Sequence, residues 1–458
     1  MKVALIYPHR KKDFTGCNPP ISLLYLASQL LQAGHHVTVI DRDDCDLSDA
    51  QIVSRLTSYS PDLVGLPVFS TNLAAAFRLV NLIADTNPHW KILLGGPHPS
   101  ARASEVLEVF DKCDYVLRGE ADQSIVDLVT CLESGADLKS VKGLSYKVDG
   151  TVVRNPDADV VRDLDSLPFP ARDILSDAYR RRSYWRIEHR GITDVIITSR
   201  GCPFNCRFCF KVSNKFRPRS PESIIGELMD IRSRGIRNVH FMDDLFVWNK
   251  ARCLAVLDQI TKKKLNMHFK VRARADLIDE DLLSAMKRAG VSSVAFGIES
   301  GSQTVLDSMH KRVTVDMNYR AIRLTKKFGL QCYADAFLGF PGETPETIRE
   351  TEKLLLDAKP TALNLSVMYP LPDTPVYNAA KAEGTLVGDW DVKGTRPWIK
   401  LPWIEDLRTL YEYRNRVHRR FLGNPVVAFN AARFLFPRIG LTQLRMLADH
   451  YRRTVIGR

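Results

Sequence analysis

No apolar run in this 458-residue chain approaches the roughly 18 residues that a membrane-spanning helix needs, so any membrane contact should be peripheral. The start of the chain lacks the positively charged segment and long apolar stretch of a secretory signal. Its nine cysteines are odd in number and unevenly spaced, which is not typical of a secreted disulfide framework. Together these absences predict a cytoplasmic protein.

The first 140 residues alternate short β-rich apolar runs with segments of helical periodicity. The expected strands are 3–7, 37–41, 63–67, 91–95 and 115–118, and the expected helices are 22–33, 49–58, 73–86 and 104–110. This alternation predicts an α/β fold with a doubly wound parallel sheet over residues 1–140, whose ligands bind outside the carboxyl ends of the strands. The loop Pro8–Pro20 has no G-x-G-x-x-G, which argues against NAD.

A second alternation follows a proline-containing connector, residues 141–190, in which we expect a strand-turn-strand at Gly143–Val153. Its expected strands are 195–198, 238–242, 268–273, 293–298, 332–337 and 363–367, and its expected helices include 221–234, 250–262, 280–289 and 317–328. Six such units over residues 191–400 predict a partial (β/α)6 barrel of the TIM type. In such barrels the catalytic groups belong at the carboxyl ends of the strands.

Three cysteines lie in one short turn of this second region, Cys202-Pro-Phe-Asn-Cys206-Arg-Phe-Cys209. Thiolates select zinc, copper(I) or iron–sulfur clusters, and four of them normally close a zinc site or saturate a 4Fe-4S cluster. A fourth is missing here, because the next cysteine is Cys253 and the turn has no histidine. We therefore predict that the three are metal-binding, catalytic ligands of a 4Fe-4S cluster with one open iron. A structural zinc knuckle or a chance group of core cysteines is the alternative.

The stretch Thr198–Phe210, including the aromatic Phe208 before the third cysteine, resembles the signature of the radical S-adenosylmethionine (radical SAM) enzymes. The resemblance implies that the open iron chelates the amino and carboxylate groups of SAM. The reduced cluster would then split SAM to a 5′-deoxyadenosyl radical, while the protein orients SAM and excludes competing reactions. An external electron donor such as flavodoxin or ferredoxin is also implied.

Residues at the ends of the later strands extend this resemblance to the SAM site. Asp243 and Asp244 close the second strand, where the family often carries Gly-Gly-Glu, and would hold the SAM ammonium. Arg274 ends the third strand and could bind the SAM carboxylate or a substrate anion. The implied cofactor-binding residues after the fourth and fifth strands are Glu299, Ser300 and Gly339. Singly, such residues are more often helix caps or surface ion pairs, but here four strand ends carry them in order.

Four stretches at the strand ends of the first region resemble the cobalamin-binding domain of the cobalamin-dependent radical SAM family. They are Asn18-Pro-Pro-Ile-Ser-Leu-Leu-Tyr-Leu-Ala, Pro61-Asp-Leu-Val-Gly-Leu-Pro-Val-Phe-Ser-Thr-Asn, Leu94-Gly-Gly-Pro-His-Pro-Ser and Arg118-Gly-Glu. The residues that would bind cobalamin are Ser22, Ser70, Thr71, Gly95, Gly96, Gly119 and Glu120. Glycine there would let the backbone approach the corrin closely, although paired glycines and prolines are also ordinary turn residues.

Many corrinoid proteins supply a histidine to cobalt from a D-x-H-x-x-G motif, which this chain does not have. We therefore expect cobalt to lack a protein histidine ligand. His98, a lone loop histidine, is not expected to replace it. A vestigial first domain that binds no cobalamin is the alternative.

The last region, residues 401–458, is predicted to be helical and basic, and it contributes to a net charge of +12. From Arg414 to Arg458 many arginines alternate with apolar and aromatic residues. Such a pattern is typical of peripheral contact with an anionic membrane surface or a phosphorylated substrate. A solvated helical bundle that caps the barrel explains it equally well. Nucleic acid is an unlikely partner, since no recognised binding module accompanies the charge.

Taken together, the chain is identified as a member of the cobalamin-dependent radical SAM family, of the class B methyltransferase type. The resemblance implies methylation of an unactivated carbon in a small-molecule or lipid substrate. Cyclisation or rearrangement remains open, as does a tRNA methylthiotransferase. That last family expects a second cluster on N-terminal cysteines, and the spacing of Cys17, Cys45, Cys113 and Cys131 does not fit it. A cluster-bearing redox or cobalamin sensor is the non-enzymatic alternative.

Overall fold

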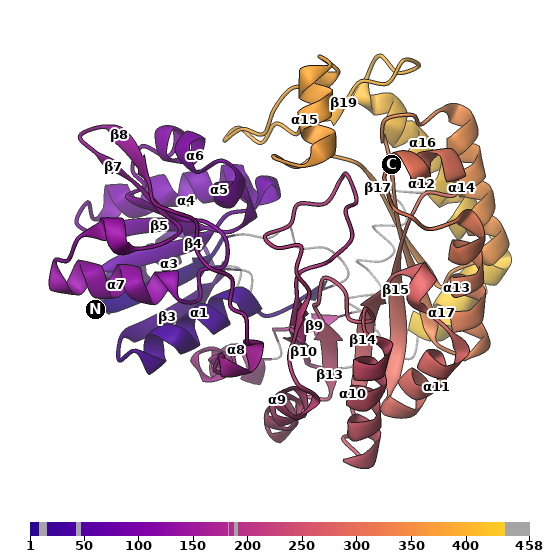
Figure 1. Cartoon of the computed structure of the whole chain (residues 1–458), viewed down its shortest axis with the longest axis horizontal. Coiled ribbons are helices and arrows are strands. Elements are labelled where there is room, and N and C mark those ends of the chain that lie inside the picture. Colours follow the sequence, from indigo (N-terminus) through magenta and orange to yellow (C-terminus); the bar gives the residue numbers. More distant parts are fainter. Residues whose placement is uncertain (9–15, 43–46, 182, 187–190, 436–458) are drawn as a thin grey trace.

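The computed structural model describes residues 1–8, 16–42, 47–181, 183–186 and 191–435, with side chains described as far as residue 430. Figure 1 shows two α/β units side by side. The first is built on a seven-stranded sheet. In spatial order its strands are β3 (His36–Asp41), β1 (Lys2–Tyr7), β4 (Leu63–Pro67), β5 (Lys91–Gly95), β6 (Tyr115–Leu117), β7 (Leu144–Val148) and β8 (Thr151–Arg154).

Alternate residues of β1 explain the layers of this unit. Val3 and Leu5 face one core with helices α1 (Ile21–Gln32) and α7 (Ser124–Ser134). Ala4 and Ile6 face a second core with α3 (Asp49–Tyr59), α4 (Leu73–Thr86) and α6 (Ala103–Val109). Because both faces of a parallel strand are covered, β4 is buried at every position. The predicted doubly wound parallel sheet is confirmed for β3, β1, β4, β5 and β6.

A hairpin extends this sheet beyond its parallel part. Strands β7 and β8 lie within residues 141–190, which the sequence suggested to be a connector, and β7 pairs antiparallel with β6. Asp149 and Gly150 join the two strands with φ of +49° and +78°. Two central residues with positive φ form the type of tight turn that matches the twist of a hairpin, and Asp-Gly is a preferred pair for it. The hairpin therefore belongs to the first sheet, where it covers the edge of β6.

The second unit is a sheet of six parallel strands. They follow chain order, β10 (Thr193–Ile196), β13 (Asn238–Phe241), β14 (His268–Ala273), β15 (Val291–Glu299), β16 (Gln331–Leu338) and β17 (Ala362–Val367). The helices between them are α9 (Pro221–Ser233), α10 (Lys250–Lys262), α11 (Glu280–Ala289), α12 (Gln303–Ser308), α13 (Val315–Lys327) and α14 (Pro345–Ala358). The predicted partial (β/α)6 barrel is confirmed, with β10 and β17 as its two edges.

Local signals fix these repeats, and α11 is a clear case. Its N-cap Asp279 accepts a hydrogen bond from the Leu282 N–H, and its C-cap Gly290 has a φ of +95°. A Cβ at Gly290 would lie 2.4 Å from the Met267 carbonyl oxygen, so only glycine fits there. Leu283 and Met286 bury the inner face of the helix. The helix therefore ends where the next strand must begin.

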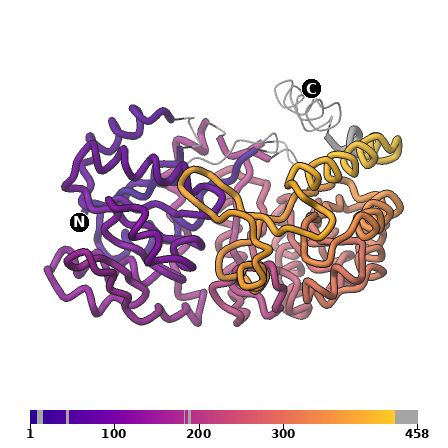
Figure 2. Tube along the Cα trace, turned by 90° about the horizontal axis from the view of Figure 1, so that it is seen from above, coloured from indigo at the N-terminus to yellow at the C-terminus, as the bar shows by residue number. Residues whose placement is uncertain are grey.

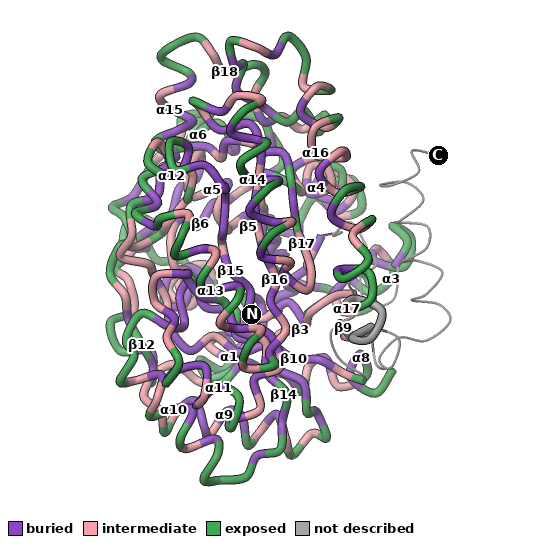
Figure 3. The backbone as a smooth tube through the Cα atoms, turned by 90° about the vertical axis from the view of Figure 1, so that its right-hand side faces the viewer, coloured by how far each residue is buried: buried purple, intermediate pink, exposed green. Residues whose placement is uncertain are grey.

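Short elements complete the chain. They are β2 (Gly16–Cys17), α5 (Pro97–Ala101), α8 (Ser176–Arg180), β9 (Trp185–Arg186), β11 (Ser199–Arg200), β12 (Arg217–Pro218), α15 (Pro375–Ala382), β18 (Leu386–Val387), β19 (Trp398–Ile399), α16 (Leu407–Leu422) and α17 (Pro425–Leu435). The strands of both sheets run through the buried part of the molecule (Figure 3).

After β17 the chain crosses from the barrel to the first unit, as Figure 2 shows for the orange segment. Trp390 enters a core of the first unit, and Arg102 donates to Asp389 at 3.2 Å. Helix α16 then returns to the barrel, where Leu410, Val417 and Phe421 are buried in the core that includes β17 and α14. For α16 the packing fits the capping alternative.

Residues 436–458 of the predicted basic region lie outside the described residues, and no described helix has the length and apolar character to span a bilayer.

Candidate functional site

The cysteine turn begins where β10 reaches its carboxyl end. Strand β11, just before the turn, pairs antiparallel with β12, which closes residues 201–216 into a loop. Gly201 at its base has a φ of +82°, and a Cβ there would lie 2.2 Å from the Lys215 carbonyl oxygen. Only glycine permits this close approach. The loop that carries the three cysteines is therefore fixed at its base.

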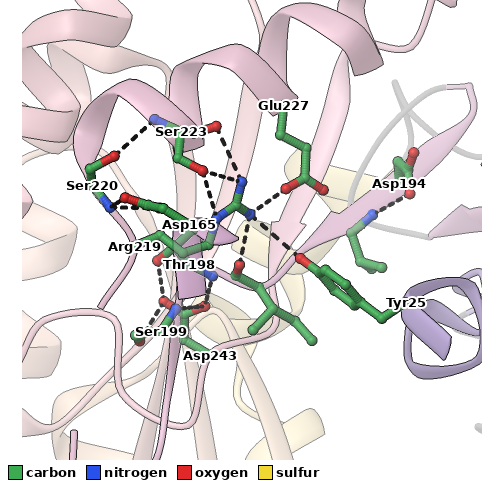
Figure 4. A network of polar contacts seen from close by, with 12 residues as sticks. Tyr25, Asp165, Asp194, Thr198, Ser199, Arg219, Ser220, Ser223, Glu227 and Asp243 are labelled. Carbon is green, nitrogen blue, oxygen red and sulfur yellow. Dashed lines mark hydrogen bonds and ion pairs between the residues drawn. The ribbon is translucent and has the colours of Figure 1, made fainter. Parts of the chain in front are cut away.

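Asp243 holds the chain that leads into this loop (Figure 4). Its carboxylate accepts hydrogen bonds from the backbone N–H groups of Thr198, at 2.5 Å, and Ser199, at 3.3 Å, and from both hydroxyls. Burial raises the pKa of Asp243, and these hydrogen bonds oppose the rise. The exposed Asp244 accepts from the Gly201 N–H at 3.0 Å. Both carboxylates therefore hold the cysteine loop, which sequence analysis had not anticipated, and Asp243 is buried away from solvent.

We expect Asp243→Asn to lower both stability and iron content. An amide retains the shape but loses an accepting oxygen, so one buried donor on Thr198 or Ser199 loses its partner, at a cost of about 1–3 kcal/mol. Asp244→Asn is the control, because this side chain is exposed and water can replace its contact. Thermal denaturation and iron analysis after anaerobic reconstitution measure both effects. Equal behaviour of the two variants would contradict the role given to Asp243.

A buried charge network lies beside this strand end. Arg219 pairs with Glu227 of α9, and its guanidinium lies 3.5 Å from the Tyr25 hydroxyl of α1 (Figure 4). Arg172, from the stretch between the two units, pairs with Glu227 at 2.7 Å and with Asp194 of β10 at 2.8 Å. The network ties the first unit to the start of the barrel, next to the cysteine loop.

Arg274 and Glu299, from two strand ends, meet Lys311 and Cys206 at the cysteine turn. Lys311 donates to Glu299 at 2.7 Å, and Arg274 donates to the Lys311 carbonyl oxygen at 2.7 Å and to the Cys206 sulfur at 4.0 Å. All four are buried. Burial alone would lower the Lys311 pKa, but the charge of Glu299 and their hydrogen bond raise it. Lys311 therefore stays charged. It lies on a loop outside any motif, and sequence analysis did not select it.

Gly297 makes room for this pair. A Cβ at Gly297 would lie 2.3 Å from the Glu299 carboxylate and 3.1 Å from the Lys311 nitrogen. Glu299 itself has a φ of +61°, and the register of β15 against β16 shifts beside it. Non-glycine residues in this conformation mark a strained backbone that often belongs to a functional site. The glycine and the strain together direct the carboxylate into the barrel.

The thiols of Cys206 and Cys209 are hydrogen-bonded to each other. The bond from Cys209, together with the cations Lys311 and Arg274, lowers the pKa of Cys206 to about 6, although burial opposes this. Among the described residues no three histidine, cysteine or acidic side chains could share a single metal ion. A cluster has a different requirement, because separate thiolates bind its separate irons. The turn thus offers a ready thiolate and suits a cluster better than one ion.

Phe208, Ser300 and Gly339 occupy different surroundings. The Phe208 ring packs edge-on against Phe337 at 5.0 Å, on the inner side of the barrel. Gly339 follows β16 and has a φ of +99°. A Cβ at this position would lie 2.9 Å from the Leu410 side chain of α16. Ser300 instead contacts Thr351 of α14 at 3.1 Å between the hydroxyl oxygens. Phe208 therefore packs the cysteine turn against β16, whereas Ser300 is directed toward the outer helix α14.

A cavity of about 530 Å³ lies between the first unit and the cysteine turn. It is lined by Gly119 and Glu120 on one side and by Cys206 and Cys209 on the other. Its size is within the range of small-molecule sites, roughly 300–1,000 Å³. Glu120 is not free, because it pairs with Arg217 at 2.5 Å across the two units. The cavity thus places a predicted cobalamin loop opposite two of the predicted cluster ligands.

Ser100 connects the loops that follow β5 and β6. Its hydroxyl donates to the Gly96 carbonyl oxygen at 2.8 Å and accepts from the Gly119 N–H at 2.9 Å. Gly96 has a φ of +101°, and its Cβ would lie 2.9 Å from the Val68 carbonyl oxygen. Gly96 therefore permits contact between two loops of the protein. Gly95 differs, because its nearest neighbour would be 3.6 Å away, at the Leu117 oxygen.

Of the remaining residues predicted to bind cobalamin, one is buried and two are exposed. Ser70 is buried, and its hydroxyl oxygen lies 2.9 Å from His98 Nδ1. Burial lowers the His98 pKa to about 4, so the ring is neutral and engaged within the fold. Ser22 and Thr71 are exposed. His98 thus has a structural partner within the fold.

Comparison with known proteins adds to this geometry. Residues 196–355 match the radical SAM superfamily, and residues 12–129 match the B12 binding domain. An uncharacterized methyltransferase of Pyrococcus horikoshii, PH0819, is 29% identical over 94% of this chain and 92% of its own length. The anaerobic magnesium-protoporphyrin IX monomethyl ester cyclase of Rubrivivax gelatinosus is 29% identical over 82% of this chain and 69% of its own.

Two solved structures share the fold. The radical SAM methyltransferase TsrM from Kitasatospora setae, with tryptophan and a SAM analogue bound, superposes with a TM-score of 0.76, 18% identity and coverage of 98% of this chain and 99% of its own. The cobalamin-dependent radical SAM enzyme OxsB, with aqua-cobalamin and SAM bound, gives a TM-score of 0.79, 19% identity and coverage of 98% and 70%. The likeness therefore covers both units and their arrangement.

Proposed function

We propose, for this radical SAM protein with a B12-binding domain, that it is a cobalamin-dependent methyltransferase acting on an unactivated carbon of a small-molecule or lipid substrate. The observation that carries the proposal is the cavity of about 530 Å³ shared by the first unit and the cysteine turn. A methyl donor on one wall and a substrate radical formed near the other would meet there without diffusion. When bound, the cluster with SAM supplies the radical and cobalamin supplies the methyl group.

The cysteine turn fits the cluster in its donor set. Cys202, Cys206 and Cys209 are proposed to bind three irons and to leave the fourth open for SAM. The lowered pKa of Cys206 favours the thiolate that ligation requires. Phe208 would shield this side of the barrel from water through its contact with Phe337.

The charged pair beside the turn fits SAM. Glu299 and Lys311 would together hold its polar groups, and Arg274 would position Cys206 and the loop that carries Lys311. Asp244 and Gly339 remain candidate SAM contacts, since they lie at the carboxyl ends of β13 and β16. Asp243 would act through the loop that it holds.

Product analysis tests this function without knowledge of the substrate's name. The protein is reconstituted anaerobically with iron, sulfide and hydroxocobalamin. It is then given SAM, a reductant and extracts as a source of substrate. We expect it to form both S-adenosylhomocysteine and 5′-deoxyadenosine. A methyltransferase of this kind consumes SAM in both ways. Formation of 5′-deoxyadenosine alone would favour a cyclase, an alternative that the similarity to the protoporphyrin ester cyclase supports.

Gly95 offers a test of the cobalamin site. Because a Cβ there meets only ordinary contacts, Gly95→Trp should fold and place an indole above the carboxyl edge of the sheet. We expect corrinoid content to fall by most of its value while iron content is retained. Leu31→Trp is the control, since Leu31 is 44% exposed near the carboxyl end of α1 and lies outside the loops that follow the strands. Full corrinoid retention in the Gly95 variant, measured by absorbance after gel filtration, would argue against this edge as the site.

The remaining partners belong to the same proposal. A small electron donor such as flavodoxin or ferredoxin would reduce the cluster in the cytoplasm. Peripheral contact with anionic lipid would involve the basic C-terminal region and should weaken with salt, because exposed charges are screened beyond about 10 Å at 0.1 M. Flotation of the full chain with phosphatidylglycerol vesicles at two salt concentrations measures it.

A further inference from the structure

Two arginines near the carboxyl end of β17 have no acidic partner among the described residues. Arg396 lies between β18 and β19, and Arg414 lies on α16. Two other arginines on the same helix have acidic partners. Arg408 pairs with Glu412 at 3.4 Å, and Arg420 pairs with Glu352 of α14 at 3.1 Å. Arg414 therefore differs from these two arginines in having no described counter-charge, as does Arg416, which stacks over Tyr413 at 4.4 Å from the ring centroid.

Two tyrosines hold the unpaired arginines in position. The Arg396 guanidinium stacks over the Tyr369 ring at 5.3 Å from its centroid, and Arg414 stacks over Tyr411 at 4.7 Å. The hydroxyls of Tyr369 and Tyr411 contact each other. We call these four residues the arginine–tyrosine cluster. They come from three separate elements, and a stacked guanidinium keeps its N–H edge available for a planar acceptor.

The charges of the cluster are not neutralised from within. Arg414 donates to the Asn415 side-chain oxygen, at 2.7 and 3.1 Å, which is a neutral acceptor. Burial, followed by the contact with Tyr411, raises the Tyr369 pKa to about 12, so this hydroxyl stays neutral near pH 7. Burial lowers the pKa of Arg414, which reflects the cost of a partly desolvated cation. An anion bound here would offset that cost.

The cluster borders the proposed reaction site. Leu410, next to Tyr411, packs against Gly339 at the end of β16, and Phe337 of the same strand contacts Phe208 in the cysteine turn. On its other side Tyr369 packs against Trp390, at 6.3 Å between ring centroids, and Trp390 belongs to the core of the first unit. A group bound by the cluster would thus lie at the junction of the two units, beside the carboxyl ends of the barrel strands.

We propose that the arginine–tyrosine cluster binds an anionic group, a carboxylate or a phosphate, of the substrate. Two guanidiniums that stack on a pair of tyrosines in mutual contact suit the paired oxygens of either group, through charge-assisted hydrogen bonds. That the ligand is a substrate rests on the proposed methyltransferase function. Anion binding itself does not, since it requires only the cluster. The substrate would then be a polar, negatively charged molecule whose reacting carbon lies at a distance from its anionic end.

Calorimetric titration tests the proposal by measuring the affinity of the reconstituted holoprotein for anions. Inorganic phosphate and acetate are titrated separately, at constant ionic strength. The double variant R396Q/R414Q should bind the preferred anion at least about tenfold more weakly, because it loses the charge-assisted hydrogen bonds. R408Q is the matched control, since Arg408 lies on the same helix but is exposed and paired, and it should bind as the unaltered chain does. The anion that binds more tightly shows whether the cluster prefers a phosphate or a carboxylate.

The double variant should also retain iron, corrinoid and melting temperature, which separates lost binding from lost folding. Absence of binding of both anions by the unaltered chain would overturn the proposal, as would equal affinity in the double variant. A folding failure of the double variant is resolved by R396Q alone, because Arg396 is exposed and its replacement leaves the packing of α16 intact. Failure of the methyltransferase function would appear in the SAM products and would leave these affinities unchanged.

Discussion

Replacement of Cys202, Cys206 or Cys209 by alanine is expected to abolish formation of 5′-deoxyadenosine from SAM. Three thiolates must jointly hold the cluster, and the turn offers no fourth that could substitute for a lost one. Each single variant should therefore lose most of its iron after anaerobic reconstitution, as well as the broad absorbance of the cluster. Iron analysis and chromatography of the SAM products measure both losses.

Two buried cysteines serve as controls for this result. Cys332 is fully buried in β16, and Cys253 donates from its sulfur to the Phe246 carbonyl oxygen at 2.9 Å. Burial raises the pKa of both thiols, and both lie outside the cysteine turn, in α10 and β16. Their alanine variants should keep iron and SAM cleavage, with at most a modest loss of stability from the small cavity. A triad variant that still produces 5′-deoxyadenosine would disprove the cluster assignment.

Lys311→Met is expected to have the second largest effect. It leaves the Glu299 carboxylate buried without its cation, and breaking a buried pair in this way costs about 3–5 kcal/mol. It also removes a cation that favours the Cys206 thiolate. We therefore expect a lower melting temperature, weaker SAM binding and less iron than in the unaltered chain. Differential scanning fluorimetry and equilibrium dialysis with labelled SAM measure the first two.

Lys327→Met is the matched control for this variant. Lys327 pairs with Glu280 at 3.1 Å, but both side chains are largely exposed, and such surface pairs contribute about 0–1 kcal/mol. The double variant Lys311→Met with Glu299→Gln should recover much of the melting temperature, because no charge is then left buried alone, yet SAM binding should stay weak. Recovery of SAM binding in the double variant would mean that the pair has only a structural role.

The fold follows from local patterns, and so sequence analysis could predict it. Period-two and period-3.6 apolar repeats mark each strand and helix, and cap residues such as Asp279 and Gly290 fix where they end. The cysteine triad could be predicted for a similar reason, since its three ligands lie within eight residues. The β7–β8 hairpin was anticipated as a strand pair, but its attachment to β6 depends on a long-range contact that no local pattern carries.

The parts of the site that sequence analysis missed all depend on distant partners. Lys311 approaches Glu299 from a loop whose sequence has no distinguishing motif. Asp243 was correctly placed at the end of a strand, but its carboxylate is directed to Thr198, which only the folded barrel reveals. Glu120 was selected for its loop, whereas its pairing with Arg217 spans the two units. Charge and spacing thus identified the edges of the site but not the contacts within it.

Electron paramagnetic resonance of the cob(II)alamin form tests the central claim most directly, namely that one chain holds cobalamin opposite its cluster. Protein purified with hydroxocobalamin should retain corrinoid in stoichiometric amount after gel filtration. Its spectrum should lack splitting from a protein nitrogen, because His98 is buried and its Nδ1 is bonded to Ser70. Retained corrinoid with a histidine-type spectrum would contradict the site geometry. A chain that binds no corrinoid, yet cleaves SAM, would remove cobalamin from the reaction and leave a radical SAM enzyme with a vestigial first domain.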